Sequence, residues 1–279
     1  MKTGIWIGSI QADYTEGRIP VDDTLGAMSV ALFKVNDGLN YQPYTPDDSA
    51  YFANGVYRPQ GIDFMPQGNG RGLSIDEARQ EGELAGRHAA ASSSEYILDL
   101  EPEPDLYWQG IPGTAKAFCE GYASTSGGIK LRLNPDARNP GINLEEWVRE
   151  PIVGIWHPQM YAATFGESQE YWEGKGIEPL LNLGVPKSSI YPMLSTYVQA
   201  PGDPPMNPDT LEASIRCYAD RGYPGFCLFR RRTMSSQQVE RLLSMRDPFS
   251  PAPPPSPIVH SFTIPNGAKI VGDTTITWG

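Results

Sequence analysis

Two carboxylates placed two residues apart are the groups in this chain best suited to acid–base chemistry. They lie in EYILDLEPEPDLYW, residues 95–108, where apolar residues alternate with a period of two until Pro102, as in a strand. Asp99 and Glu101 then share one face, with Cα atoms roughly 6.5–7 Å apart. Because close, partly buried carboxylates repel each other, one pKa should rise and leave a proton donor near neutral pH. Alternatively, Asp99 caps a turn and Glu101 is a solvated strand end.

Eight strand-like segments, separated by helical ones, would position these acids. Their centres are roughly 25 to 35 residues apart, the length of one strand–helix unit. Eight such units predict an α/β fold, a closed (β/α)8 TIM barrel. A flavodoxin-like open sheet is the alternative, but the regular spacing and the lack of a glycine-rich phosphate loop favour closure. The expected strands are residues 4–10, 28–35, 61–66, 96–101, 129–134, 153–161, 190–197 and 225–230.

Four of the expected helices have recognisable N-terminal signals. A Ser or Asn three residues before a Glu or Gln indicates a capping box, and a Pro suits the first helical turn. These signals are Ser74 with Glu77, Asn143 with Glu146, Asn207 before Pro208, and Ser235 with Gln238.

The working face of a closed barrel lies at the C-terminal ends of its strands. Those ends provide carboxylates, amides, aromatic rings and some positive charge: Lys34, Asp99, Glu101, Arg132, Asn134, Gln159, Tyr161 and Phe229. Trp108 follows the fourth strand and could stack on a sugar ring, so we expect a polysaccharide groove. Alternatively, Lys34 and Arg132 pair with acids inside the barrel.

Composition excludes several kinds of partner. The 279 residues are 39% hydrophobic, enough for a sizeable core, and carry a net charge of -11. Such a charge argues against nucleic acid and anionic membrane surfaces. No stretch approaches the roughly 18 apolar residues of a membrane span. The first ten residues have too short an apolar run for a signal peptide, so we expect cytoplasmic synthesis, followed by virion association or export by another route.

Neither the histidines nor the cysteines form a metal motif, and we expect no metal and no cofactor. The three histidines are scattered, and mid-strand His157 is expected to be a core residue with satisfied hydrogen bonds. The three cysteines fall in predicted helices or strands and should be buried, apolar and free of disulfides.

The composition changes after residue 247, which bounds the predicted barrel domain, residues 1–247. Residues 248–257, PFSPAPPPSP, predict a stiff polyproline linker. Residues 258–279 alternate like strands but are too few to bury a core of their own. This tail either docks on the barrel or begins a further β domain, and it indicates a module of a larger surface, secreted or virion-borne assembly.

The strand ends resemble those of two glycosidase families. The D-L-E triplet at 99–101 looks like the D-x-E of family-18 chitinases, and Q-M-Y at 159–161 is similar to the Q-x-Y of plant-type members. Phe229 lies where that family has an aromatic residue. The N-D-G at 36–38, with the acid pair, also resembles family-25 lysozymes. Both families are barrels that cleave β-1,4 links next to N-acetylated sugars.

The family-18 resemblance implies that Glu101 is the general acid and later the base. It implies that Asp99 and Tyr161 position the substrate's acetamide, which attacks in place of a protein nucleophile. The family-25 resemblance gives Asp99 a more direct electrostatic role, and in both cases Gln159 hydrogen-bonds the sugar. The chain departs from family 18 at Ser94 and Ile97, where that family has Asp. It also lacks the family-25 acids of strands one and eight.

The leading interpretation is therefore a glycoside hydrolase acting on peptidoglycan or a chitin-like polymer, with no metal. Glu101, Asp99 and Tyr161 would be catalytic. The substrate contacts would be Gln159, Asn134, Lys34, Trp108, Phe229 and Arg132. One alternative is a barrel without catalysis that binds glycan or serves as a structural module, as the missing aspartates suggest. Another is an enzyme for an anionic substrate, suggested by Lys34, Arg132 and Arg230.

Overall fold

The computed structural model describes residues 4–7, 30–101, 108–137, 142–202, 204–229 and 234–245. The predicted linker at 248–257 and the tail at 258–279 lie outside these residues, as does the end of the predicted first strand.

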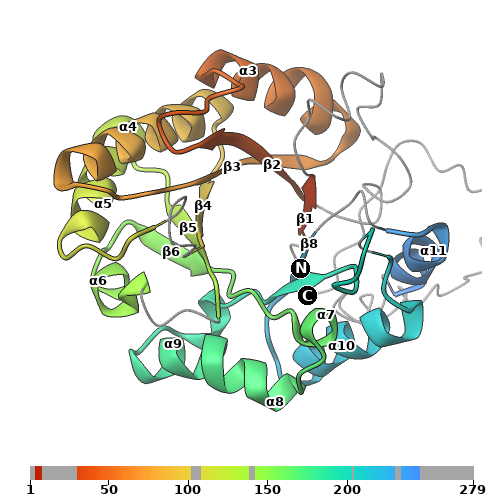
Figure 1. The fold of residues 1–279 in the computed structure, drawn as a ribbon. Helices are drawn as coiled ribbons and strands as arrows, with labels where there is room; N and C mark the ends of the chain where they lie inside the picture. The colour runs from red at the N-terminus through yellow and green to blue at the C-terminus, as the bar shows by residue number, and fades with distance from the viewer. Residues whose placement is uncertain are drawn as a thin grey trace, which may run out of the picture.

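One eight-stranded parallel sheet forms the centre of the fold, in the order β6-β5-β4-β3-β2-β1-β8-β7. Isolated parallel bridges, Trp156 to Ile190 and Gln159 to Met193, join the segments at its two ends. The helices lie around the outside of the strands (Figure 1). The predicted α/β fold with a parallel sheet is therefore confirmed. The strands are Gly4–Ile7 (β1), Val30–Asp37 (β2), Asp63–Asn69 (β3), Tyr96–Leu100 (β4), Leu131–Pro135 (β5), Val153–Trp156 (β6), Met193–Ser195 (β7) and Cys227–Phe229 (β8).

Helices follow most of the strands, and several are short or interrupted. They are Pro46–Tyr51 (α3), Ile75–Ser92 (α4), Thr114–Thr125 (α5), Leu144–Val148 (α6), Ala162–Phe165 (α7), Gln169–Trp172 (α8), Glu178–Asn182 (α9), Pro208–Asp220 (α10) and Ser236–Ser244 (α11). The π-helical turns Phe52–Tyr57 and Glu173–Ile177 extend α3 and join α8 to α9. None of the helices in the described ranges combines the length and apolar character needed to cross a bilayer.

All four predicted helix starts are correct. Ser235 and Gln238 form a full capping box, and the side chains of Ser74 and Asn207 each accept a backbone hydrogen bond. Helix α6 begins after Asn143 as predicted, but the capping box predicted for it does not form. Asn143 has a left-handed backbone and no side-chain capping bond, and the Glu146 carboxylate accepts from the backbone N–H of Gly113 instead.

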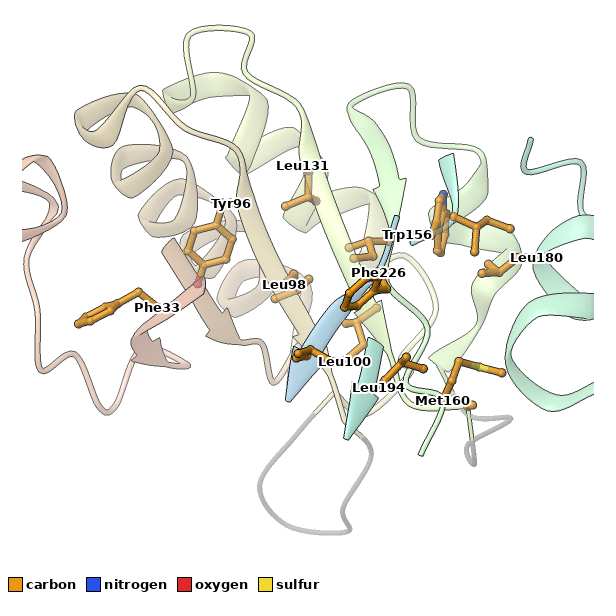
Figure 2. Close-up of a cluster of buried hydrophobic side chains, with 14 of the residues drawn as sticks. Phe33, Tyr96, Leu98, Leu100, Leu131, Trp156, Met160, Leu180, Leu194 and Phe226 are labelled. Atoms are coloured by element: carbon orange, nitrogen blue, oxygen red, sulfur yellow. The ribbon is translucent and has the colours of Figure 1, made fainter. Parts of the chain in front are cut away.

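Alternation along the strands divides the buried side chains between two faces. One set packs under the helices and includes Phe33, Tyr96, Leu98, Leu100 and Leu131 (Figure 2). The other set forms a smaller inner cluster on the opposite face, which we name the inner face: Val30, Leu32, Met65, Ile97, Tyr161, Met193 and Cys227. The three cysteines are free. Cys119 and Cys227 are buried as predicted, whereas Cys217 is only partly buried.

Helices α4 and α5, which flank β4, pack unusually closely through glycine. A Cβ added at Gly82 would lie 2.0 Å from the backbone oxygen of Phe118, and one at Gly121 would lie 2.1 Å from that of Arg79. Both distances are far inside van der Waals contact, so only glycine permits this approach. This approach fixes α4 and α5 relative to each other beside the sheet.

Gly82→Ala should therefore destabilise the protein by about 3 kcal/mol, because the backbones must separate to admit one methyl group. Gly174→Ala is the control, since its Cβ would meet only Glu178 Oε2, at 3.8 Å. That change should stay within about 1 kcal/mol of the wild type. Chemical denaturation measures both, and equal effects of the two substitutions would contradict the packing argument.

Candidate active site

The side chains of Asp99 and Glu101, at the end of β4, both approach the side-chain amide of Gln159. Asp99 is buried on the inner face, and Glu101 follows the end of β4 and is partly exposed. Gln159 Nε2 lies 3.1 Å from Asp99 Oδ1 and 3.4 Å from Glu101 Oε1. Asp99 and Glu101 therefore lie close together at the end of β4, as the alternation predicted.

A second amide, which the sequence analysis missed, binds the other side of Asp99. Gln67 Nε2 donates to Asp99 Oδ2 at 3.2 Å. Its strand had been predicted to end at Pro66, but β3 continues to Asn69 in parallel register with β4. The period of two through Met65, Gln67 and Asn69 could have revealed it.

Asn134 completes this group of amides, at the end of β5. Its Oδ1 accepts from Gln159 Nε2 at 2.9 Å, and its Nδ2 donates to the backbone oxygen of His157 at 2.7 Å. Asn134 is buried and already bonded on both sides. It therefore orients Gln159, and the direct substrate contact predicted for it would require an exposure that it does not have here.

Burial raises the pKa of Asp99 well above its usual value, and the negative charges of Glu101 and Asp136 add to the rise. Lys34 and the hydrogen bond from Gln159 act in the opposite direction. Burial therefore favours the neutral form of Asp99. Asp136 is a further buried acid that was not predicted, because its strand was expected to end at residue 134; its backbone bridges to Gln159.

An aromatic wall stands beside the acids. The ring of Tyr161 stacks on Phe229 with centroids 5.6 Å apart, and Tyr197 lies 6.2 Å from Phe229. Burial, followed by the charges of Asp99 and Glu101, raises the pKa of Tyr161, so its hydroxyl stays protonated and can donate. The structure therefore brings Tyr161 and Phe229 together with the acid pair.

Lys34 also belongs to this end of the sheet. A bulge in β2 pairs Lys34 with Gln67 and Asp37 with Asn69, which turns both charged residues to the same face. Lys34 Nζ lies 3.3 Å from Asp37 Oδ2, and its side chain remains partly exposed. Within the described residues, no group of three or more His, Cys, Asp or Glu side chains could hold a metal ion.

Arg132 does not fit the substrate-binding role predicted for it. It lies on the inner face beside Ile97, one layer below Asp99. Its buried guanidinium pairs with Glu95, with Nε 2.8 Å from Oε2, and Nη1 lies 3.3 Å from His157 Nε2. The alternative, an interior ion pair, describes it correctly. Burial and Arg132 lower the pKa of His157 to about 3, so it is a neutral core histidine, as predicted.

Trp108 is likewise misplaced for stacking on a sugar. Its side chain is 2% exposed, and its ring lies 4.9 Å from that of Trp147 and 6.1 Å from that of Phe118. It packs in the helix-side core, because the chain before α5 lies against the connection between β3 and α4: Gln109 N donates to the backbone oxygen of Arg71. The aromatic residues near the acids are instead Tyr161, which directly precedes α7, and Phe229 at the end of β8.

No family model and no curated protein sequence matches this chain. Solved structures do match its fold. A class V chitinase from Nicotiana tobaccum, a mutant in complex with NAG4, superposes with a TM-score of 0.60 at 13% identity, covering 88% of this chain and 98% of that chain. The catalytic domain of a family GH18 chitinase from the fern Peteris ryukyuensis gives 0.59 at 11% identity, covering 88% and 99%. The chitinase-like agglutinin of Robinia pseudoacacia gives 0.58 at 11% identity, also covering 88% and 99%.

The chain therefore has the fold of GH18 chitinases and of chitinase-like proteins, as the strand-end motifs indicated. The fold is shared by hydrolases and by an agglutinin, so the chemistry must be argued from the site.

The raised pKa of Asp99 predicts how stability depends on pH. Because the folded state holds this proton more tightly than the unfolded state, wild-type stability falls as pH rises above about 4 toward the folded pKa. Asn has no titrating proton, so its stability contribution does not change with pH. Gln67 Oε1 is buried and has no hydrogen-bond partner among the described residues. If the Gln67 side-chain amide rotates by half a turn, this oxygen can accept from Nδ2 of the new asparagine. At about pH 8, Asp99→Asn should unfold roughly 2–4 °C above the wild type, equivalent to about 1 kcal/mol.

Thermal unfolding at about pH 4 and about pH 8 checks this expectation, since the gain should shrink at the lower pH. The exposed Asp220 supplies the control substitution, Asp220→Asn, with little effect at either pH. A gain for Asp99→Asn that is equal at both pH values would argue against a buried, neutral Asp99.

Proposed function

We propose that this chain is a glycoside hydrolase that cleaves β-1,4 linkages in a polysaccharide containing N-acetylhexosamine. Peptidoglycan or a chitin-like polymer is the natural class of substrate. The observation that carries the proposal is the Gln159 amide, bonded to both Asp99 and Glu101 at the end of β4 with Tyr161 nearby. The fold likeness to chitinases, one of them in complex with NAG4, supports it.

The proposal includes closure of the sheet into a (β/α)8 barrel. Backbone hydrogen bonds support it, from Met193 N to Pro158 O at 2.9 Å and from Met160 N to Met193 O at 2.7 Å. In a closed barrel the ends of β2, β4, β6 and β8 face one opening, so the acids and the aromatic wall would share a single groove.

In the proposed mechanism the acid pair holds one proton, which passes from Asp99 to Glu101, and Glu101 transfers it to the substrate. Glu101 is partly exposed, so it can reach a bound glycosidic oxygen, protonate it and let the leaving sugar depart. The carbonyl oxygen of the substrate's own acetamido group attacks the anomeric carbon at the same step. Glu101, now a carboxylate, then takes a proton from the water that opens the intermediate.

Asp99 and Tyr161 would orient that acetamido group. The protonated Tyr161 can donate a hydrogen bond to the acetamide oxygen. Asp99, once its proton has passed to Glu101, can accept a hydrogen bond from the acetamide N–H. Gln159 fixes the two carboxyl groups, Phe229 supplies an apolar wall for the ring, and Lys34 gives positive charge at the rim.

A second candidate function is glycan binding without turnover. Ser94 and Ile97 stand where family-18 enzymes have aspartates, and the fold is also that of the Robinia pseudoacacia agglutinin. Ile97 belongs to the apolar inner cluster, directly below Asp99 on the same strand face. The protein would then bind chito-oligosaccharides and release them unchanged.

Glu101→Gln separates the two functions. If Glu101 is the acid and base, kcat on chito-oligosaccharides or peptidoglycan fragments should fall about 10²–10⁴-fold, while the Kd measured by calorimetry stays close to that of the wild type. Glu83→Gln, on the exposed face of α4, is the matched control and should leave both constants unchanged.

A Glu101→Gln protein that cleaves at the wild-type rate would remove Glu101 from the mechanism. A wild-type protein that binds the oligosaccharides but turns none over at any pH tested would establish the glycan-binding alternative.

A further inference from the structure

Gln67 contacts the acid pair from the side opposite Gln159. Its Nε2 lies 3.2 Å from Asp99 Oδ2, while Gln159 Nε2 lies 3.1 Å from Asp99 Oδ1. Each carboxyl oxygen of Asp99 therefore accepts one amide hydrogen bond, from residues on opposite sides of β4. All three side chains are buried, so water does not compete for these bonds.

Among the described residues, no cation donates a hydrogen bond to Asp99. Lys34 Nζ is directed to Asp37, and Arg132 is paired with Glu95 one layer lower. Ile97, the next residue below Asp99 on the same face, is apolar. The orientation of the Asp99 carboxyl group therefore depends on two neutral amides.

Gln67 is a costly residue to bury at this position. Its Oε1 has no hydrogen-bond partner, and its neighbour on the same face of β3 is the apolar Met65. A buried amide that makes one of its possible bonds is less stable than an apolar side chain of similar size. Packing alone would favour a residue such as methionine here, so the bond to Asp99 is what the glutamine provides.

We propose that Gln67 is a positioning residue of the glycosidase site, which together with Gln159 fixes the plane of the Asp99 carboxyl group. Rotation of that group would break both amide bonds, so the group keeps one orientation toward the substrate and Glu101. This inference rests on the proposed function. It assigns Gln67 an effect on the reaction that is exerted through Asp99, without contact with the reacting atoms.

Gln67→Met tests the role, because methionine keeps the length and volume of the side chain but donates no hydrogen bond. Loss of the donor should raise the pKa of Asp99 further, since a donor favours the ionised form. The carbon-13 shift of the Asp99 carboxyl group measures this titration, with Asp99→Asn used for assignment.

Turnover should change in step with the titration. We expect kcat of Gln67→Met to fall about tenfold or more with KM within about twofold, because the effect is on orientation in the transition state. The melting temperature should be equal to or higher than that of the wild type, since an unsatisfied polar group has been removed. Met65→Leu, two residues earlier on the same face, is the control and should leave kcat and the Asp99 titration unchanged.

Gln67→Asn serves as a second variant if the methionine protein does not fold, because its shorter chain withdraws the amide from Asp99. An unchanged Asp99 titration in a folded variant would overturn the inference, and so would unchanged kcat and KM. If the wild type binds oligosaccharide but has no turnover, the proposed function fails. The role of Gln67 is then decided by the Asp99 titration and by oligosaccharide binding. The variant should bind the oligosaccharide with a higher Kd than the wild type.

Discussion

The buried carboxyl group of Asp99 at the end of β4 must be hydrogen-bonded by the neighbouring strands, because water does not reach it. Asp99 is buried between two amides, and the acid two residues later keeps contact with solvent. Because ionising Asp99 would place two negative charges together in a poorly solvated space, the protein stabilises the neutral form. The pair can thus hold one proton while one of its members still reaches a ligand, a condition that suits acid–base chemistry.

The inner face contains two acids, Glu95 and Asp99, that are stabilised in opposite ways. Near the start of β4, Glu95 is neutralised by the guanidinium of Arg132, and the neighbouring His157 stays uncharged. At the other end, the hydrogen bonds that Asp99 accepts within the described residues come from amides, and burial raises its pKa and so favours the neutral form. An ion pair fixes charge and stiffens the sheet, whereas a carboxyl group held by amides can exchange its proton. The same strand therefore has one end fixed by an ion pair and another whose carboxyl group is held by neutral amides.

Local patterns in the sequence predicted which face of the sheet each side chain lies on. They did not predict how far along the strand direction that side chain lies from the acid pair. Alternation placed Asp99 with Glu101 and also placed Arg132 on the inner face, yet only the parallel register shows that Arg132 lies a layer lower. Trp108 could not be predicted, because its position depends on a loop that folds back over another strand–helix unit. Gln67 was missed because Pro66 was taken as a strand end, although β3 continues through it.

The strands of the sheet differ in length, and this difference affects where substitutions can be tolerated. Strands β2 and β3, of 8 and 7 residues, and the glycine-tight pair α4 and α5 form a stiff half around the acids. Strands β7 and β8 have 3 residues each within the described ranges, so Phe229 lies among fewer strand pairs than the acids do. Substitutions around Phe229 should therefore disturb the packing around Asp99 and Glu101 little. Under the proposed function, ligand preference could change there while the two carboxyl groups remain in place.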